Sequence, residues 1–205
     1  MDLTRNLFVE MLTAALKAVE THKDELSTLD SATGDGDHGI AVCEALSAAL
    51  NSIKPEAGFK EMLNEMGFGI MMATSGSMST LMGALFLGMS DGVDKPELTP
   101  AETTAMFKSG LQNIRQQTKA DIGDKTMMDA LIPAVRALEA NQDKGLAVMF
   151  EKAASAADEG RLATINMLAK FGRARNLGDR VIGHADAGAS SITYIFKAFS
   201  NAITN

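Results

Sequence analysis

The chain has 205 residues, of which 46% are hydrophobic, and a formal net charge of −7. A chain of this size can bury one sizeable core, so we expect a single domain. The acidic balance argues against a nucleic-acid partner or an anionic membrane, since both require a basic surface. Cys43 is the only cysteine, which excludes an internal disulfide. With no signal-like N-terminus and no long apolar run, the expected location is cytoplasmic.

Apolar residues recur at steps of three and four along most of the chain, which is the pattern of amphipathic helices. The pattern predicts helices from about residue 3 to the start of an acidic stretch at residue 30, and over about 40–53, 58–74, 78–89, 146–170 and 192–203. No segment shows the alternation typical of a strand. Two further helices with N-terminal caps are predicted between residues 89 and 146. The sequence therefore predicts one all-α domain of about eight helices over residues 1–205.

The two capped helices begin near residues 100 and 127. Thr99 precedes Pro100 and stands three residues before Glu102, which predicts a capping box with proline at the first helical position. Thr126 stands in the same relation to Asp129, and a run of apolar residues on one face follows it.

The most unusual segment is Asp30-Ser31-Ala32-Thr33-Gly34-Asp35-Gly36-Asp37-His38-Gly39. Its three carboxylates repel one another unless a cation gathers them, and its glycines let the backbone turn tightly enough to aim them inward. We therefore expect a metal site at Asp30, Asp35 and Asp37. The alternative is a set of solvated acids in a turn.

The residue types favour magnesium at this site. An EF-hand calcium loop starting at Asp35 would need a bidentate glutamate at its twelfth position, where the chain has Leu46. One cysteine and three histidines leave zinc short of its usual ligands. Magnesium prefers a few carboxylates completed by water and substrate phosphates, which indicates a nucleotide as the bridging ligand.

Three further polar loops separate the predicted helices, at 74–80, 123–127 and 172–188. Hydroxyls and backbone N–H groups at a helix start bind phosphate oxygens, although a helix cap with incidental serines is an equal alternative for 74–80. If successive helices run up and down, loops on one end converge. Function is then expected on those loops.

Taken together, these segments resemble the nucleotide-binding L subunit of dihydroxyacetone kinase. The resemblance is carried by the acidic stretch, by Gly123-Asp124-Lys125-Thr126-Met127, and by the Gly172-Arg173-Ala174 and Gly183-His184-Ala185-Asp186-Ala187-Gly188 segments. Their order and spacing match over essentially the whole chain. The resemblance implies an antiparallel barrel of about eight helices with the nucleotide at one end.

The resemblance also implies how the subunit works. A partner K-type subunit would hold the ketose, and the bound nucleotide would deliver its γ-phosphate there. Because the chain ends at residue 205 without a K-like domain, it resembles the split form. In that form the bound ADP is rephosphorylated in place by a phosphohistidine carrier subunit fed from phosphoenolpyruvate.

By the same resemblance, Asp30, Asp35 and Asp37 would bind two Mg²⁺ ions that bridge the phosphates of ADP or ATP. Met127 would pack on the adenine, Arg173 would approach the phosphates, and Asp186 would line the ribose or base side. No catalytic residue beyond this site is expected on the chain. The residues expected to contact the nucleotide are His38, Gly39, Ala41, Gly76, Ser77, Ser79, Thr118, Met127, Arg173, Asp186, Ala187 and Gly188.

The phosphate loop departs from the family pattern. The family serine falls on Met78, so a phosphate hydroxyl has to come from Ser77 or Ser79, or is lost. Ala41 and Ala187 stand where the family commonly has asparagine and proline. These departures leave two alternatives open: a kinase subunit for another short ketose, and a non-catalytic nucleotide or metal sensor.

Overall fold

The computed structural model describes residues 1–73 and 76–204. Within them the α-helices are α1 (Arg5–Thr21), α2 (Lys23–Ser31), α3 (His38–Asn51), α4 (Phe59–Ala73), α5 (Ser77–Asp91), α6 (Pro100–Gln117), α7 (Met128–Ala140), α8 (Leu146–Ala163) and α9 (Ala187–Thr204). Two 3₁₀ segments, η1 (Thr164–Asn166) and η2 (Arg173–Val181), lie between α8 and α9. The strands β1 (Leu3–Thr4) and β2 (Glu97–Leu98) pair antiparallel, with Leu3 opposite Leu98.

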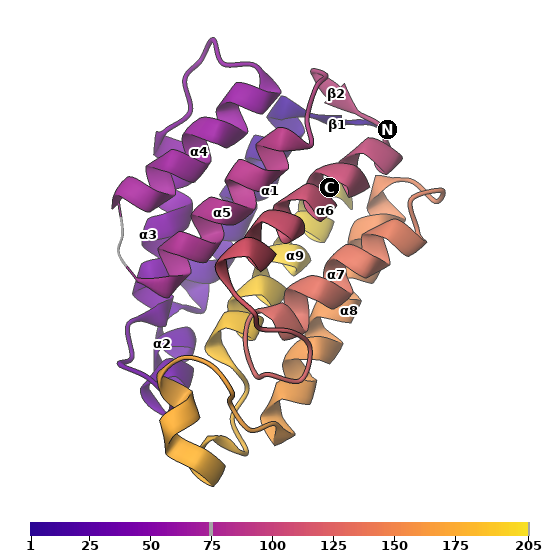
Figure 1. Cartoon of the computed structure of the whole chain (residues 1–205). Coiled ribbons are helices and arrows are strands. Elements are labelled where there is room, and N and C mark those ends of the chain that lie inside the picture. The colour runs from indigo at the N-terminus through magenta and orange to yellow at the C-terminus, as the bar shows by residue number, and fades with distance from the viewer. Residues whose placement is uncertain (74–75, 205) are drawn as a thin grey trace.

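Eight of these helices form a closed ring (Figure 1). The helices α3 to α9 pack in chain order, and α1 closes the ring between α9 and α3, while α2 lies outside against α3 and α9. Because successive ring helices alternate in direction, the connections α1–α3, α4–α5, α6–α7 and α8–α9 all leave from one end of the ring. The predicted all-α domain, an antiparallel barrel of about eight helices, is confirmed.

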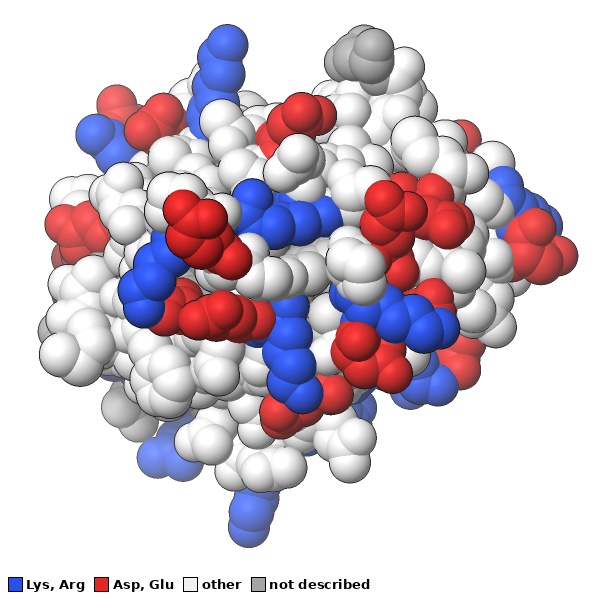
Figure 2. Space-filling model, turned by 90° about the horizontal axis from the view of Figure 1, so that it is seen from above, with Lys and Arg blue, Asp and Glu red and all other residues white. Residues whose placement is uncertain are grey.

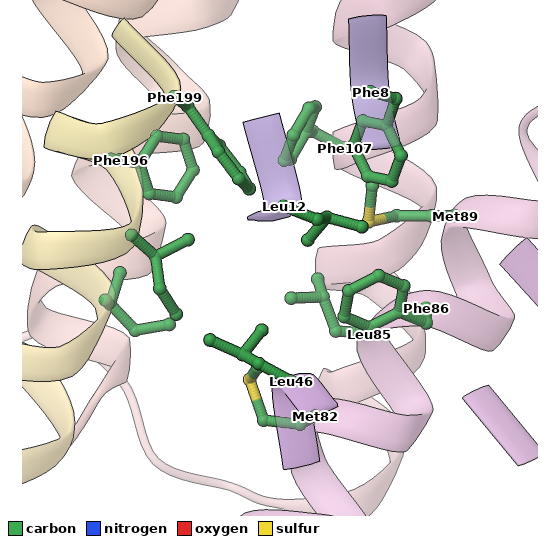
Figure 3. A pocket seen from close by; sticks show the side chains of 12 residues that line it. Phe8, Leu12, Leu46, Met82, Leu85, Phe86, Met89, Phe107, Phe196 and Phe199 are labelled. Atoms are coloured by element: carbon green, nitrogen blue, oxygen red, sulfur yellow. The ribbon is translucent and has the colours of Figure 1, made fainter. Parts of the chain in front are cut away.

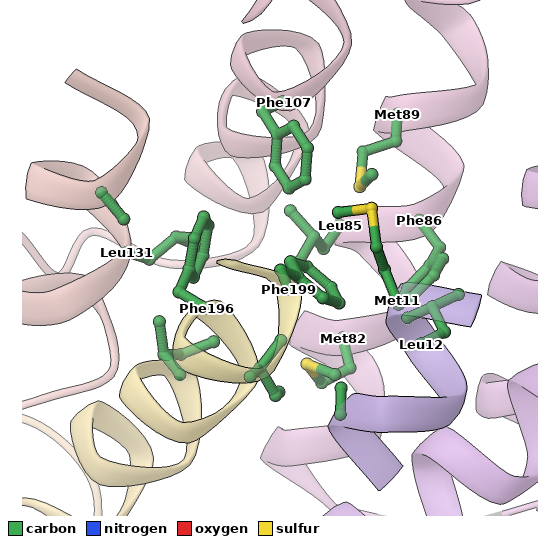
Figure 4. Close-up of a cluster of buried hydrophobic side chains, with 14 of the residues drawn as sticks. Met11, Leu12, Met82, Leu85, Phe86, Met89, Phe107, Leu131, Phe196 and Phe199 are labelled. Carbon is green, nitrogen blue, oxygen red and sulfur yellow. The ribbon is translucent and has the colours of Figure 1, made fainter. Parts of the chain in front are cut away.

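The ring encloses an apolar core. Aromatic side chains of α6 and α9 meet methionine and leucine side chains of α1 and α5 in its middle (Figure 4). The ring centroids of Phe107 and Phe196 lie 5.8 Å apart, and those of Phe8 and Phe199 lie 6.2 Å apart. A cavity of about 20 Å³ remains there, lined only by apolar side chains such as Leu46 (Figure 3). Such a cavity has room for about one water molecule, so polar chemistry is confined to the ends of the ring.

The end opposite the four convergent connections carries interspersed acidic and basic side chains (Figure 2). Ion pairs join Lys54 to Glu65, Lys95 to Glu102 and Lys108 to Glu139. Exposed pairs of this kind contribute little to stability. Within the described part of the chain, no helix is long and apolar enough to cross a bilayer.

Two predicted helix lengths are wrong, for reasons that lie in tertiary contacts. The first helix breaks at His22, whose N–H donates to the carbonyls of Ala18 and Val19 and whose ring stacks on Tyr194 of α9 at 4.0 Å. The helix predicted to reach residue 170 ends at Ala163 and passes into η1. The β1–β2 pair was also missed, since two-residue strands are too short to show alternation.

The predicted capping box is confirmed. The Thr99 hydroxyl accepts from the Glu102 N–H at 3.3 Å, and the Glu102 carboxylate accepts from the Thr99 N–H at 2.9 Å. Pro100 is the first residue of α6. These contacts are local in sequence, which is why the sequence alone reveals them.

Candidate functional site

The acidic stretch folds so that its three carboxylates meet. One oxygen from each of Asp30, Asp35 and Asp37 lies within 4.8 Å of the others, and we call these residues the carboxylate cluster. Asp30 stands near the end of α2 and is half-buried, while the other two are exposed just before α3. Oxygen donors gathered at this spacing suit a hard divalent cation, so the residues present fit the predicted magnesium.

Asp30 also shapes the loop around the cluster. Its Oδ2 accepts from the N–H groups of Gly36 at 2.9 Å, Asp37 at 3.2 Å and His38 at 3.4 Å. A Cβ on Gly34 would lie 2.4 Å from Asp30 Oδ1, and Gly36 has a φ of 80°. Both glycines are therefore required by the turn, since a side chain would clash at the first and strain the backbone at the second.

Arg173 of η2 reaches the cluster from the far part of the sequence and ion-pairs with Asp35. The Arg173 guanidinium lowers the pKa of Asp35 below its usual range. The pKa of Asp37 is raised, first by desolvation and then by the charges of Asp35 and Asp30. Repulsion between the carboxylates thus persists beside the arginine, and a bound cation would relieve it.

His38 follows the cluster in sequence and is the half-buried first residue of α3. Its Nε2 is 3.1 Å from the hydroxyl of Ser191 on α9, and that hydroxyl donates to the Gly188 carbonyl at 2.9 Å. The direction of the bond between Nε2 and Ser191 depends on which ring nitrogen carries the proton. Burial lowers the pKa of His38, against opposing contributions from the charge of Asp30 and from a hydrogen bond with the Ala187 backbone. Ser191 was missed by sequence reasoning because only the packing of α9 against α3 brings it here.

The Gly123–Met127 loop is held by a carboxylate from the next helix. Asp129 accepts from the N–H groups of Gly123 at 2.6 Å and Thr126 at 2.7 Å, and the Thr126 hydroxyl accepts from Met128 at 3.2 Å. Thr126 and Asp129 are paired as predicted, but the Asp129 carboxylate accepts from the Thr126 N–H, whereas in a capping box the threonine hydroxyl would also accept from the Asp129 N–H. Met127 is buried in the core at 4% exposure.

Asp186 caps α9. Its Oδ2 accepts from the Ala189 N–H at 2.7 Å, and its own N–H donates to the Thr164 hydroxyl at 2.9 Å. Burial raises the pKa of Asp186 to about 7, against the opposing bond from Ala189. The following Gly188 lies against Met127, because a Cβ there would be 3.1 Å from the Met127 Cβ.

The serine loop is described from Gly76 onward, and its predicted positions 74 and 75 lie outside the described residues. Ser77 is exposed at the start of α5, whereas Ser79 is buried and donates its hydroxyl to the Gly76 carbonyl at 3.1 Å. Of the two serines considered for the phosphate, Ser77 therefore has the accessible side chain. Met78 is half-buried against the core.

The other predicted residues lie at the same end of the ring. Ala41 is in the first turn of α3, beyond the buried Gly39. Thr118 ends α6 and its hydroxyl accepts from the Ala120 N–H at 3.1 Å. Ala187 is buried at the first position of α9. The fold thus brings the predicted site residues onto the four convergent connections and the helix turns beside them (Figure 1).

The sequence and the fold match known proteins. The DAK2 domain model matches residues 32–201. The chain is 32% identical over 203 residues to the PEP-dependent dihydroxyacetone kinase, ADP-binding subunit DhaL, of Escherichia coli, with 96% of each chain covered. It is 30% identical over 200 residues to the PTS-dependent dihydroxyacetone kinase, ADP-binding subunit DhaL, of Lactococcus lactis, covering 95% of this chain and 96% of that one.

A solved structure shares the fold. The dihydroxyacetone kinase from C. freundii, in complex with AMP-PNP and Mg²⁺, superposes with a TM-score of 0.75 at 22% identity. The superposition covers 98% of this chain and 34% of the longer kinase chain.

Proposed function

The chain belongs to the DAK2 domain family, among the ADP-binding subunits of dihydroxyacetone kinase, and we propose that it passes a phosphoryl group from bound nucleotide to a ketose on a partner. The observation that carries this proposal is the convergence of the carboxylate cluster, Arg173 and the helix-start loops at one end of the ring. Residues 1–205 would form one nucleotide-binding unit.

In the proposed site, Asp30, Asp35 and Asp37 would hold two Mg²⁺ ions that bind the phosphates of ADP or ATP. The metal, when bound, would neutralise the negative charge of the phosphoryl group during its transfer. Asp30 keeps the loop closed through its three N–H bonds, and Arg173 adds a cation beside the phosphates. Phosphoryl transfer depends mainly on such positioning and charge, which suits a site without its own general base.

We propose two partners for this end of the molecule, a K-type subunit that holds the ketose and a phosphohistidine carrier that recharges the bound ADP. Support comes from the exposed large apolar side chains. Among the described residues, all of them except Met1 lie on elements near the end of the ring that carries the site. We call them the apolar rim: Ile40, Phe68, Met71, Met72, Ile122, Leu162, Leu168 and Ile182. Exposed apolar groups concentrated on one face favour a protein interface.

The natural acceptor is proposed to be dihydroxyacetone, the ketose in the names of the relatives. The location is proposed to be the cytoplasm, where the nucleotide and phosphoenolpyruvate are available. Because the serine loop differs from the family pattern, two alternatives remain: a kinase subunit for another short ketose, and a nucleotide or metal sensor that transfers no phosphoryl group.

The proposal is tested by analysing the purified chain for bound ADP by mass spectrometry and ultraviolet absorbance. Label from phosphoenolpyruvate should then reach dihydroxyacetone when a K-type subunit and a phosphohistidine carrier are added. Nucleotide without transfer to any ketose would favour the sensor. A protein that holds no nucleotide, and whose melting temperature ADP and Mg²⁺ leave unchanged, would contradict both.

Asp35→Asn is expected to abolish ADP retention while the helical circular-dichroism spectrum stays that of the parent, because the exposed Asp35 serves the cluster rather than the core. Asp91→Asn, an exposed carboxylate at the other end of α5, is the matched control and should retain ADP. Loss of the helical fold in Asp35→Asn would instead show that the loop is structural.

A further inference from the structure

The segment 165–183 between α8 and α9, which we call the excursion, carries Arg173 and is closed at its neck. The Gly183 N–H donates to the Ile165 carbonyl at 2.8 Å, where the two ends of the excursion meet. Directly outside that bond, the Lys125 Nζ donates to the Thr164 carbonyl at 2.5 Å and to the His184 carbonyl at 2.6 Å. One ammonium group from the α6–α7 connection thus bridges both ends of the excursion.

Burial of its charge and a strained backbone both make the position of Lys125 energetically unfavourable. It is only 3% exposed, and it is the one non-glycine residue with positive φ, 57°, in the described part of the chain. Lysine is rarely buried, and the left-handed conformation is unfavourable for its side chain. The carboxylates of Asp129 and Asp186 offset the buried charge. A glycine would adopt this backbone conformation without strain, and an exposed lysine would keep its hydration. A strained and buried lysine outside the carboxylate cluster therefore indicates a role for its ammonium group at this position.

The neighbouring residue holds the body of the excursion. The Asp124 carbonyl accepts from the Lys170 N–H at 3.1 Å, and its carboxylate accepts from the Lys170 Nζ at 2.7 Å. Three residues further on, Arg173 reaches Asp35. Within the excursion, Val181 is the one fully buried residue and the half-buried Phe171 packs against the core, so the excursion has few apolar contacts and the polar tethers help to hold it in place.

We propose that Lys125 is a positioning residue: by bridging the neck of the excursion, it sets the place of Arg173 beside the carboxylate cluster and thereby the affinity for Mg-ADP. This inference rests on the proposed function. It assigns the buried lysine of the Gly123–Met127 loop to the orientation of an arginine on another loop, and not to direct contact with the nucleotide.

A double-mutant cycle on the full chain tests it, with Mg-ADP affinity measured by calorimetry. Lys125→Met should weaken binding roughly tenfold, the effect typical of removing a residue that orients a ligand group. Arg173→Met should weaken it as well, and the double variant should bind no more weakly than Arg173→Met alone, because Lys125 acts through Arg173. Lys60→Met, an exposed lysine at the opposite end of the ring, should bind as the parent does.

Parental affinity in Lys125→Met would overturn the inference, and so would losses that add in the double variant. If Lys125→Met fails to fold, the exposed Lys170→Met removes the second tether without leaving a buried cavity and should show the same non-additivity with Arg173→Met. If the losses of Mg-ADP affinity in Lys170→Met and Arg173→Met add in the double variant, that result would count against the inference.

Amide hydrogen exchange of the ligand-free protein gives a separate reading. Exchange across 166–183 should quicken in Lys125→Met while α1 and α5 keep their protection, and unchanged exchange would overturn the inference. Failure of the parent chain to bind Mg-ADP would instead overturn the proposed function, and the exchange result would still decide whether Lys125 holds the excursion.

Discussion

At the scale of single residues, the aspartates of this chain differ in function because their surroundings differ. Asp35 is exposed and paired with Arg173, Asp30 accepts three backbone N–H groups, and Asp186 is half-buried just before α9. Desolvation favours the neutral carboxyl and an adjacent cation favours the charged one. The same residue type therefore occurs as an exposed member of the carboxylate cluster, as an acceptor that closes the loop and as a helix cap.

Asp186 makes stability depend on pH. Its pKa is raised from 3.8 to about 7 in the folded chain, so the stabilisation from its neutral form is present below pH 4 and lost as the pH rises through 7. Asp186→Asn removes the titrating group and keeps an acceptor for Ala189. We expect the fall in melting temperature between pH 5 and pH 8 to be smaller by a few degrees in this variant than in the parent.

The measurement is a series of melting curves on the ligand-free protein. Asp91→Asn should show the same fall as the parent. Equal falls in Asp186→Asn and the parent would mean that this carboxyl is already ionised at pH 5 in the folded state.

At the scale of elements, the closest approach between α7 and α8 depends on one glycine. A Cβ on Gly160 would lie 1.9 Å from the Asp129 carbonyl oxygen, so the two helices would have to move apart. In the same way, a Cβ on Gly88 of α5 would lie 2.5 Å from the Asn113 Cβ on α6. Glycine within a helix is intrinsically unfavourable, and these positions keep it because backbone approaches backbone.

Gly160→Ala is therefore expected to destabilise the protein by about 2 kcal/mol, through forced separation of α7 and α8, despite the better helix propensity of alanine. For a chain of this size that is a fall in melting temperature of roughly 4–8 °C. Ser155→Ala places an alanine at an exposed position of the same helix and should not lower it. A melting temperature that rises in Gly160→Ala, as propensity alone predicts, would contradict the close approach.

At the scale of the whole molecule, the two ends of the ring differ. One end carries interspersed charges and surface ion pairs, and the other carries the carboxylate cluster and the residues of the apolar rim. The up-and-down order of the helices separates them, since it sends the four connections that carry the predicted site residues to one end and the α3–α4, α5–α6 and α7–α8 connections to the other.

The double variant Phe68→Ser, Met72→Ser tests the apolar rim. Both side chains are exposed on α4, so the melting temperature and Mg-ADP affinity should stay parental, while transfer to the ketose should need roughly tenfold more K-type subunit because apolar contact area is lost. Lys60→Ser replaces an exposed side chain of the same helix outside the rim and should change neither. Parental dependence of transfer on the K-type subunit would place its docking surface elsewhere.

Features that depend on near neighbours along the chain can be predicted from the amino-acid sequence. The capping box of Thr99 and Glu102, the buried helix faces and the metal-like spacing of Asp30, Asp35 and Asp37 are all visible in short windows, because helix periodicity and turn chemistry act over a few residues. The family resemblance added the closed ring and the nucleotide end, which local patterns alone do not contain.

Which distant groups meet follows from the packing of the folded chain and not from local patterns. That packing pairs Arg173 with Asp35, Ser191 with His38 and Lys125 with the neck of the excursion, and it breaks the first helix at His22 against Tyr194. Each of these contacts joins residues far apart in sequence, so its free energy depends on burial and on the partner that packing supplies. A pattern read along one chain records neither.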